Sequence, residues 1–157
     1  MKKLLLILLC LPFIGFGQTA QEYFEKAYNS SDDQYKIDNY TKCLRIDPDY
    51  STAYCNRGNA YKELEDYKNA IADYTRAIKI DPDYSTAYYN RGNAYKELED
   101  YKNAIADYTR AIKIDPDFAN AYDGRGTAMW YLKVEYCSDY IRACNLGVCF
   151  NYNKFCK

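Results

Sequence analysis

A segment of 34 residues occurs twice in succession in this chain of 157 residues. Residues 47–80 recur as residues 81–114, and the only difference is Cys55 in the first copy against Tyr89 in the second. A third copy begins at Asp115 and diverges after Ala128, and residues 40–49 match the end of a further copy upstream. A period of this length is typical of solenoid proteins, in which each repeat buries its apolar face against the next.

Each complete copy predicts two helices joined by a short turn. Residues 52–64 form the first helix and residues 67–80 the second. The second helix has apolar residues at helical spacing, namely Ala70, Ile71, Tyr74, Ala77 and Ile78. Pro82 ends the pair, because the residue before a proline avoids helical dihedral angles. Gly58 and Ala70 are small, so we expect the two helices to approach closely there.

Seven positions of each copy resemble the signature of the tetratricopeptide repeat. They are Tyr54, Gly58, Tyr61, Ala70, Tyr74, Ala77 and Pro82, followed by Tyr88, Gly92, Tyr95, Ala104, Tyr108, Ala111 and Pro116. Arg57 and Arg91 depart from the family pattern, which favours leucine. The resemblance implies an all-α, right-handed superhelical solenoid of antiparallel helix pairs, with about four units. Repetition of the signature also explains most of the 20 tyrosines, whose rings we expect to fill the layer between helices.

The first seventeen residues have the pattern of a secretion signal. Lys2 and Lys3 precede an apolar run over residues 4–14, and Gly15 and Gly17 are small residues suited to cleavage before Gln18. The run is too short to cross a bilayer, so we expect no membrane span in the mature chain; an uncleaved anchor is the alternative. The signal is of the bacterial kind and predicts a periplasmic or secreted protein.

These patterns divide the chain into six segments. They are a signal peptide (1–17), a degenerate N-terminal repeat (18–46), two complete repeats (47–80 and 81–114), a degenerate repeat (115–144) and a cysteine-rich C-terminal cap (145–157). Both degenerate units look about two residues short between their helices.

Six of the seven cysteines lie after the signal, an even number suited to disulfides in an oxidising compartment. If residues 134–144 and 149–156 form a hairpin around Gly147, the pairs equidistant from its turn are Cys144–Cys149 and Cys137–Cys156. By the same symmetry Cys43–Cys55 forms a third disulfide, with simple sequence drift at Cys55 as the alternative. A tetra-cysteine zinc site at the tail is the rival, although the paired short spacings of such sites are absent.

The resemblance assigns the concave face, and with it ligand binding, to the first helix of each repeat. The groove residues it implies are Thr52, Asn56, Asn59, Lys62, Thr86, Tyr89, Asn90, Asn93, Lys96, Asn120, Asp123, Thr127 and Trp130. An asparagine amide both donates and accepts, so a row of them suits the backbone of an extended peptide; plain solvated surface is the alternative. Trp130 is either a groove anchor or part of the core. The second helices carry mixed charge, including Asp73, Asp107 and their neighbouring lysines and arginines, which is typical of a solubilising surface.

Composition narrows the function further. The chain has no histidine, so it lacks the commonest general base and metal ligand, and it offers no nucleophile motif. Its formal net charge of −1 provides no basic field for nucleic acid. We therefore expect no enzyme, no cofactor and no metal, but an adaptor or scaffold that binds a protein or peptide. A self-assembling structural subunit of the cell envelope, a homo-oligomer, is the alternative.

Overall fold

The structure, a computed structural model, describes residues 18–156, and these residues form nine helices. They are α1 (Ala20–Tyr28), α2 (Asp33–Ile46), α3 (Ser51–Glu63), α4 (Tyr67–Ile80), α5 (Ser85–Glu97), α6 (Tyr101–Ile114), α7 (Ala119–Tyr131), α8 (Cys137–Asn145) and α9 (Phe150–Phe155). The expected signal peptide lies outside the described residues.

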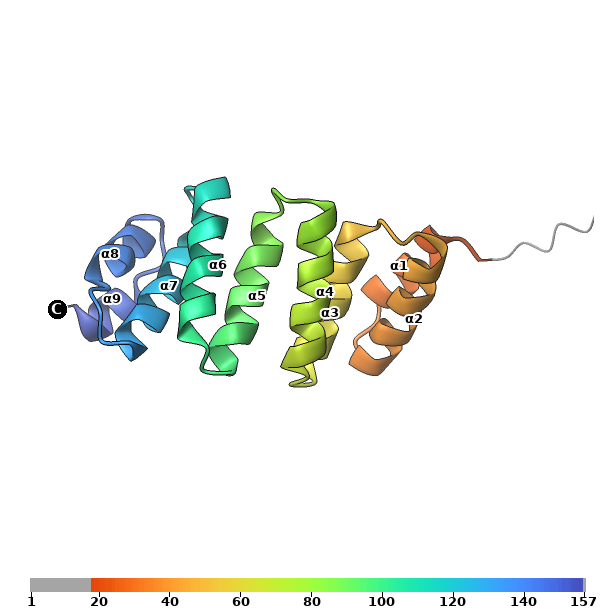
Figure 1. Cartoon of the computed structure of the whole chain (residues 1–157), viewed down its shortest axis with the longest axis horizontal. Helices are drawn as coiled ribbons and strands as arrows, with labels where there is room; N and C mark the ends of the chain where they lie inside the picture. The colour runs from red at the N-terminus through yellow and green to blue at the C-terminus, as the bar shows by residue number, and fades with distance from the viewer. Residues whose placement is uncertain (1–17, 157) are drawn as a thin grey trace, which may run out of the picture.

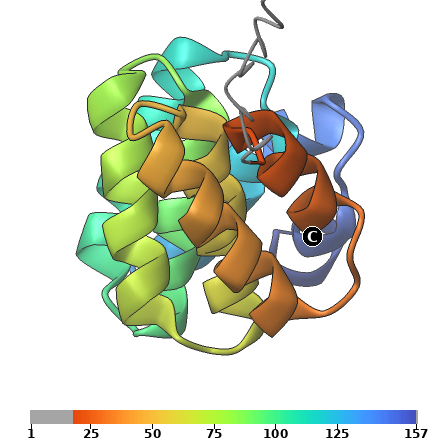
Figure 2. The same ribbon diagram turned by 90° about the vertical axis from the view of Figure 1, so that its right-hand side faces the viewer.

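The helices form consecutive pairs that stack along one axis, with α1 and α2 at one end and α8 and α9 at the other (Figure 1). Seen along that axis, α2 and α4 lie on one side of the stack and α1 on the other (Figure 2). The first helices of successive pairs also touch, α3 with α5 and α5 with α7. The all-α fold of stacked tetratricopeptide-type helix pairs is thus as the repeat predicts.

Each complete repeat reverses direction within three residues, 64–66 in the first copy. The backbone N–H of Glu65 donates to the carbonyl of Lys62, and that of Asp66 to the carbonyl of Tyr61, both at 2.9 Å, which ends α3 in a Schellman motif. The carboxylate of Asp66 then accepts from the N–H of Asn69 at 3.2 Å and caps α4. One aspartate thus ends one helix and begins the next, so the two helices stay antiparallel.

Buried tyrosines of the second helices form the core between the helices. Tyr74, Tyr108 and Tyr140 are fully buried. A Cβ atom on Gly58 would lie 2.7 Å from Cε1 of Tyr74, and one on Gly92 would lie 2.9 Å from Cε1 of Tyr108. Glycine is therefore needed at these positions, because any side chain would displace the ring packed against the first helix.

The terminal units are shorter than the complete repeats, but the shortening is in their helices and not in the turns where we expect it. α1 has 9 residues against 13 in α3, and α8 has 9 residues against 14 in α6. The connection between α7 and α8 runs over residues 132–136 and is longer than the 98–100 turn between α5 and α6. The shortening therefore falls on the helices, and the expectation of a shorter turn is wrong. A shorter helix is tolerated at an end of the stack because it has a neighbour on one side only.

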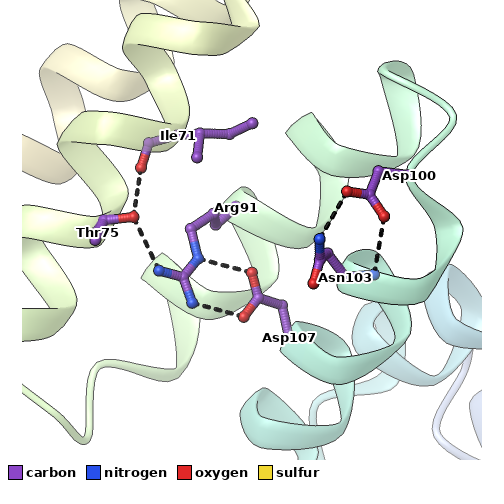
Figure 3. A network of polar contacts seen from close by, with 6 residues as sticks. All are labelled: Ile71, Thr75, Arg91, Asp100, Asn103 and Asp107. Atoms are coloured by element: carbon purple, nitrogen blue, oxygen red, sulfur yellow. Dashed lines mark hydrogen bonds and ion pairs between the residues drawn. The ribbon is translucent and has the colours of Figure 1, made fainter.

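Arginines at the positions where the family favours leucine form a ladder of ion pairs with aspartates, of which Figure 3 shows the pair of Arg91 with Asp107. Arg91 donates from Nε and Nη2 to the two carboxylate oxygens of Asp107 at 2.7 and 2.8 Å, and from Nη1 to Thr75 Oγ1 of the preceding repeat at 2.9 Å. The same triplet recurs as Thr41, Arg57 and Asp73 and as Thr109, Arg125 and Asp139. Each triplet links two helix pairs.

The carboxylates of this ladder are buried, with exposed side-chain fractions of 7–9% for Asp73, Asp107 and Asp139. The expectation that Asp73 and Asp107 belong to a solubilising surface is therefore wrong. The reason is that a guanidinium in the leucine position requires a counter-charge from the helix packed against it.

The C-terminal segment contains the two expected disulfides, Cys137–Cys156 and Cys144–Cys149. They tie α9 back onto α8, around Gly147, whose φ of 101° is readily available only to glycine. Because all four thiols are paired, they do not form the zinc site that was the rival interpretation.

The third expected disulfide is absent, because Cys43 and Cys55 are free buried thiols. Cys43 packs with Ala27, Tyr40 and Ala53 between the first two helix pairs. Cys55 packs in the next layer, against Tyr74 and Ala87. The prediction of a Cys43–Cys55 bond is thus wrong, since the two side chains point into different layers of the stack.

Candidate binding groove

The residues expected to line the groove lie on α3, α5 and α7 at equivalent positions of successive repeats. Seven of them border one cavity of about 470 Å³ near the C-terminal end, namely Tyr89, Asn93, Lys96, Asn120, Asp123, Thr127 and Trp130. This volume is within the range of ordinary ligand sites. Thr52, Asn56, Asn59, Lys62, Thr86 and Asn90 do not border this cavity, and Lys62 instead lines a second one.

The second cavity, of about 440 Å³, lies further toward the N-terminal end. It shares Tyr89, Asn93 and Lys96 with the first. A third, smaller cavity shares Lys96, Thr127 and Tyr131 with the first. The three cavities therefore adjoin, and together they form a groove that runs from the C-terminal end of α3 across α5 to α7.

Two of the expected groove asparagines also support the core. Asn59 Oδ1 accepts from the hydroxyl of Tyr74 at 2.8 Å and from Asn90 Nδ2 at 3.0 Å. Asn93 Oδ1 accepts from the hydroxyl of Tyr108 at 2.7 Å. Their acceptor oxygens are thus engaged within the protein, so toward a ligand these amides act as N–H donors. Asn59 and Asn93 are therefore not simply solvated surface residues, and they do not offer a ligand both a donor and an acceptor.

The first cavity forms where the repeat sequence changes. The position of Tyr89 is Cys55 in the repeat before and Asp123 in the repeat after, and that of Asn90 becomes Gly124. A Cβ on Gly124 would lie 2.8 Å from Cζ of Tyr108. The ring of Tyr108 therefore takes the space that a side chain at position 124 would need. The ring of Tyr89, which packs against Phe118 at 4.9 Å between centroids, forms one side of the cavity.

Helix α9 supplies a wall of this cavity that our sequence reasoning missed. Asn151, Lys154 and Phe155 all border it. The signal was present in the cysteine spacing, because a hairpin around Gly147 brings residues 149–156 back toward the preceding helices. The position of that hairpin relative to α7, however, depends on the stacking of α8.

Trp130 lies at the edge of the cavity, with 37% of its surface exposed. Its ring is 5.0 Å from that of Phe155 and 4.8 Å from that of Tyr131, between centroids. Tyr131 in turn stacks on Tyr101 at 4.6 Å. Trp130 is therefore neither a core residue nor a free surface residue, but part of an aromatic cluster with one open side.

A partly buried carboxylate anchors α9 to α7. Asn151 Nδ2 donates to both carboxylate oxygens of Asp123, at 2.9 and 2.8 Å. Burial raises the pKa of Asp123, and the hydrogen bonding of Asn151 and the charge of Lys96 oppose that rise. Lys96 and Lys154 bring positive charge to the same cavity.

Within residues 18–156, no cluster of three or more histidine, cysteine or acidic side chains is arranged to hold a metal ion. Over the same residues, none of the helices has both the length and the apolar character needed to cross a membrane.

Three family models of the tetratricopeptide repeat match the chain. A model described as "TPR repeat" matches residues 58–99, and two described as "Tetratricopeptide repeat" match residues 39–72 and 85–118. A search of curated protein sequences gave no match.

Solved structures with the same fold include three relatives of different kinds. The chain is 30% identical to the "Arabidopsis OM64 TPR domain", with a TM-score of 0.69 over 71% of this chain and 95% of that one. It is 28% identical to the "First TPR of Spaghetti (RPAP3) bound to HSP90 peptide SRMEEVD", with a TM-score of 0.71 over 74% and 94%. "Crystal structure of MamA" is similar in fold, at 24% identity and a TM-score of 0.78 over 81% and 77%.

Proposed function

The chain belongs to the tetratricopeptide-repeat family, and from this premise we propose that it is an exported protein–protein interaction module. It acts as an adaptor or scaffold that holds a peptide or a segment of a partner protein in the groove along α3, α5 and α7. The fold is of a kind that is typically non-catalytic.

The continuity of the groove carries this proposal. The first cavity shares Tyr89, Asn93 and Lys96 with the second and Lys96, Thr127 and Tyr131 with the third, so adjoining cavities offer a path to an extended chain. Amide donors on its walls suit the carbonyl groups of a peptide backbone. One relative, the TPR domain of Spaghetti (RPAP3), is bound to a peptide according to its description, which supports the same use of this groove.

Export rests on two independent features. The N-terminal residues have the charge, apolar run and small residues of a cleavable signal. The C-terminal segment carries two disulfides, which persist in oxidising compartments and are rare in the cytosol. We propose cleavage before Gln18 and a periplasmic or secreted location, and terminal sequencing of the exported protein checks both.

Photo-crosslinking in the native host tests the binding function. A photoreactive amino acid replaces Lys62, which lines the groove, or Lys79, which lies exposed on α4. We expect one discrete partner to be crosslinked from position 62 and none from position 79, as mass spectrometry of the products will show. Crosslinking from position 79 alone would refute the groove assignment, and crosslinks only to a second copy of this chain would favour the self-assembling alternative.

A further inference from the structure

Helix α9 forms a wall of the first cavity, and no equivalent helix is present in the complete repeats. α9 has six residues, none of them buried. A helix of this length is not stable by itself in water, because too few hydrogen bonds offset the cost of its first turn. Its position beside α7 therefore depends on what ties it there.

The two disulfides fasten α9 at both ends. Cys149 is the residue before its first turn and Cys156 the residue after its last, and each is bonded to α8 through Cys144 or Cys137. The other ties are side-chain contacts, chiefly Asn151 with Asp123 and the ring of Phe155 with those of Trp130 and Tyr140. Without the disulfides these contacts would have to overcome the chain entropy of a free C-terminus.

The exposed side of the aromatic cluster indicates one chemical group of the ligand. Trp130 and Tyr131 remain 37% and 51% exposed beside the cavity that Phe155 also borders. Aromatic rings pack well in offset or edge-to-face geometry, so a further aromatic side chain suits this space.

The charged residues that border the cavity indicate a second chemical group of the ligand. Lys154 makes no ion pair with any described residue, and Lys96 pairs at 3.6 Å with Glu97, whose side chain is 49% exposed, so that this bond is weak. Among residues 18–156, Asp123 is the only acidic residue that borders the cavity, and both its oxygens accept from the neutral amide of Asn151. Two lysines against one carboxylate leave a net positive charge at the cavity, which favours a carboxylate over a cation as the charged group of the ligand.

We infer that this cavity is a disulfide-dependent anchor site for an aromatic side chain with a neighbouring aspartate or glutamate in the partner polypeptide. The inference rests on the proposed function and adds the residues of α9 to the binding surface. The carboxylate comes from a side chain and not from a chain terminus, because the groove continues past Lys96 on both sides and lets the bound chain pass through.

Trp130 is the only tryptophan of the chain and provides the signal for the test. The oxidised protein is titrated with the capped peptide acetyl-Glu-Phe-Gly-amide, and the tryptophan fluorescence is followed. We expect a saturable change, with at least ten-fold weaker binding of acetyl-Lys-Phe-Gly-amide and of acetyl-Glu-Ala-Gly-amide. Equal binding of all three peptides, or no binding of any, overturns the inference. Ten-fold tighter binding of acetyl-Gly-Phe-Glu with a free C-terminus would also overturn it, by showing that the site takes a chain terminus.

Reduction tests the dependence on the disulfides. After treatment with a phosphine reductant we expect at least ten-fold weaker binding of acetyl-Glu-Phe-Gly-amide, with the helical circular dichroism largely retained. The variant with Cys137, Cys144, Cys149 and Cys156 all changed to serine is expected to bind as weakly and not to respond to the reductant. Unchanged affinity in the reduced chain refutes the inference.

Variants that keep both disulfides separate binding from folding. Phe155→Ala and Lys154→Glu are each expected to weaken binding at least ten-fold. The matched control is Lys113→Glu, which makes the same charge change on α6 away from the cavity and is expected to bind as the unmodified chain does. Full binding by Phe155→Ala would overturn the inference. If crosslinking from position 62 still finds a partner while the peptides do not bind, this inference fails and the proposed function stands.

Discussion

At the scale of single residues, the asparagines of the first helices have two roles. Asn93 borders the cavities, and its Oδ1 also accepts from the buried hydroxyl of Tyr108. Its equivalent in the preceding repeat, Asn59, does the same for Tyr74. The repeated amide is therefore required by the repeated tyrosine, whatever the groove binds. A substitution there changes stability as well as binding.

We predict that Asn93→Ala destabilises the protein by about 1–3 kcal/mol, because the buried hydroxyl of Tyr108 loses its acceptor. Alanine has the better helix propensity, and this gain of at most about 0.7 kcal/mol does not offset the loss. Urea denaturation followed by circular dichroism measures the effect. In the background of Tyr108→Phe, the same Asn93→Ala change is expected to cost less, since no hydroxyl is left unpaired.

Asn120→Ala serves as the control, because Asn120 is an exposed residue of α7 that borders the same cavity. Its effect on the free energy of unfolding is expected to stay within about 0.5 kcal/mol. Equal destabilisation by Asn93→Ala and Asn120→Ala would show that the hydrogen bond to Tyr108 contributes nothing.

At the scale of helices, the ladder of arginine, aspartate and threonine side chains connects each helix pair to the next. Arg91 bonds Asp107 on the partner helix of its own repeat and Thr75 on the second helix of the repeat before. In the last unit the hydrogen bond with Asp139 is the main cause that raises the pKa of Arg125. The ladder thus fixes both the pairing of helices and the register between pairs.

We predict that Arg91→Leu alone destabilises the protein by about 3–5 kcal/mol, because Asp107 is left as a buried carboxylate without its partner. The double variant Arg91→Leu with Asp107→Leu is expected to be far less destabilised, and neutral or stabilised if the two leucines pack well. Urea denaturation of the two variants gives the comparison. A double variant as unstable as Arg91→Leu would show that the pair itself, and not the uncompensated charge, is the main contribution.

At the scale of the whole molecule, the core consists of tyrosine rings repeated along the stack. Burial raises the pKa of Tyr40 to about 12 and also raises those of Tyr74 and Tyr108. A raised pKa in the folded state means that folding holds the proton more tightly than the unfolded chain does, whose tyrosines titrate near 10.0.

We therefore predict that the stability due to these tyrosines is complete below pH 10.0 and is lost as the pH rises from there toward and beyond about 12. The helical circular dichroism and the near-ultraviolet absorbance of tyrosinate are followed together through an alkaline titration. We expect a fraction of the tyrosines to ionise only as the helices unfold. Complete ionisation of the folded chain at pH 10.0 would contradict the assignment of buried hydroxyls.

The sequence by itself determined the helices, their pairing and the repeat, because these depend on local periodicity, on Asp66 and its equivalents as caps, and on prolines such as Pro82. It also determined the two C-terminal disulfides, since the two cysteines of each pair lie equally far along the chain from the turn at Gly147. Only the tertiary structure decided which side chains meet across the stack. It separates Cys43 from Cys55, buries Asp73 against Arg57, engages Asn59 and Asn93 with tyrosine hydroxyls and brings α9 to the groove. The bonded partners lie 15 or 16 residues apart on the two helices of one repeat, and their contact depends on how these helices pack against each other. The separation of Cys43 from Cys55 and the position of α9 depend instead on how successive helix pairs stack.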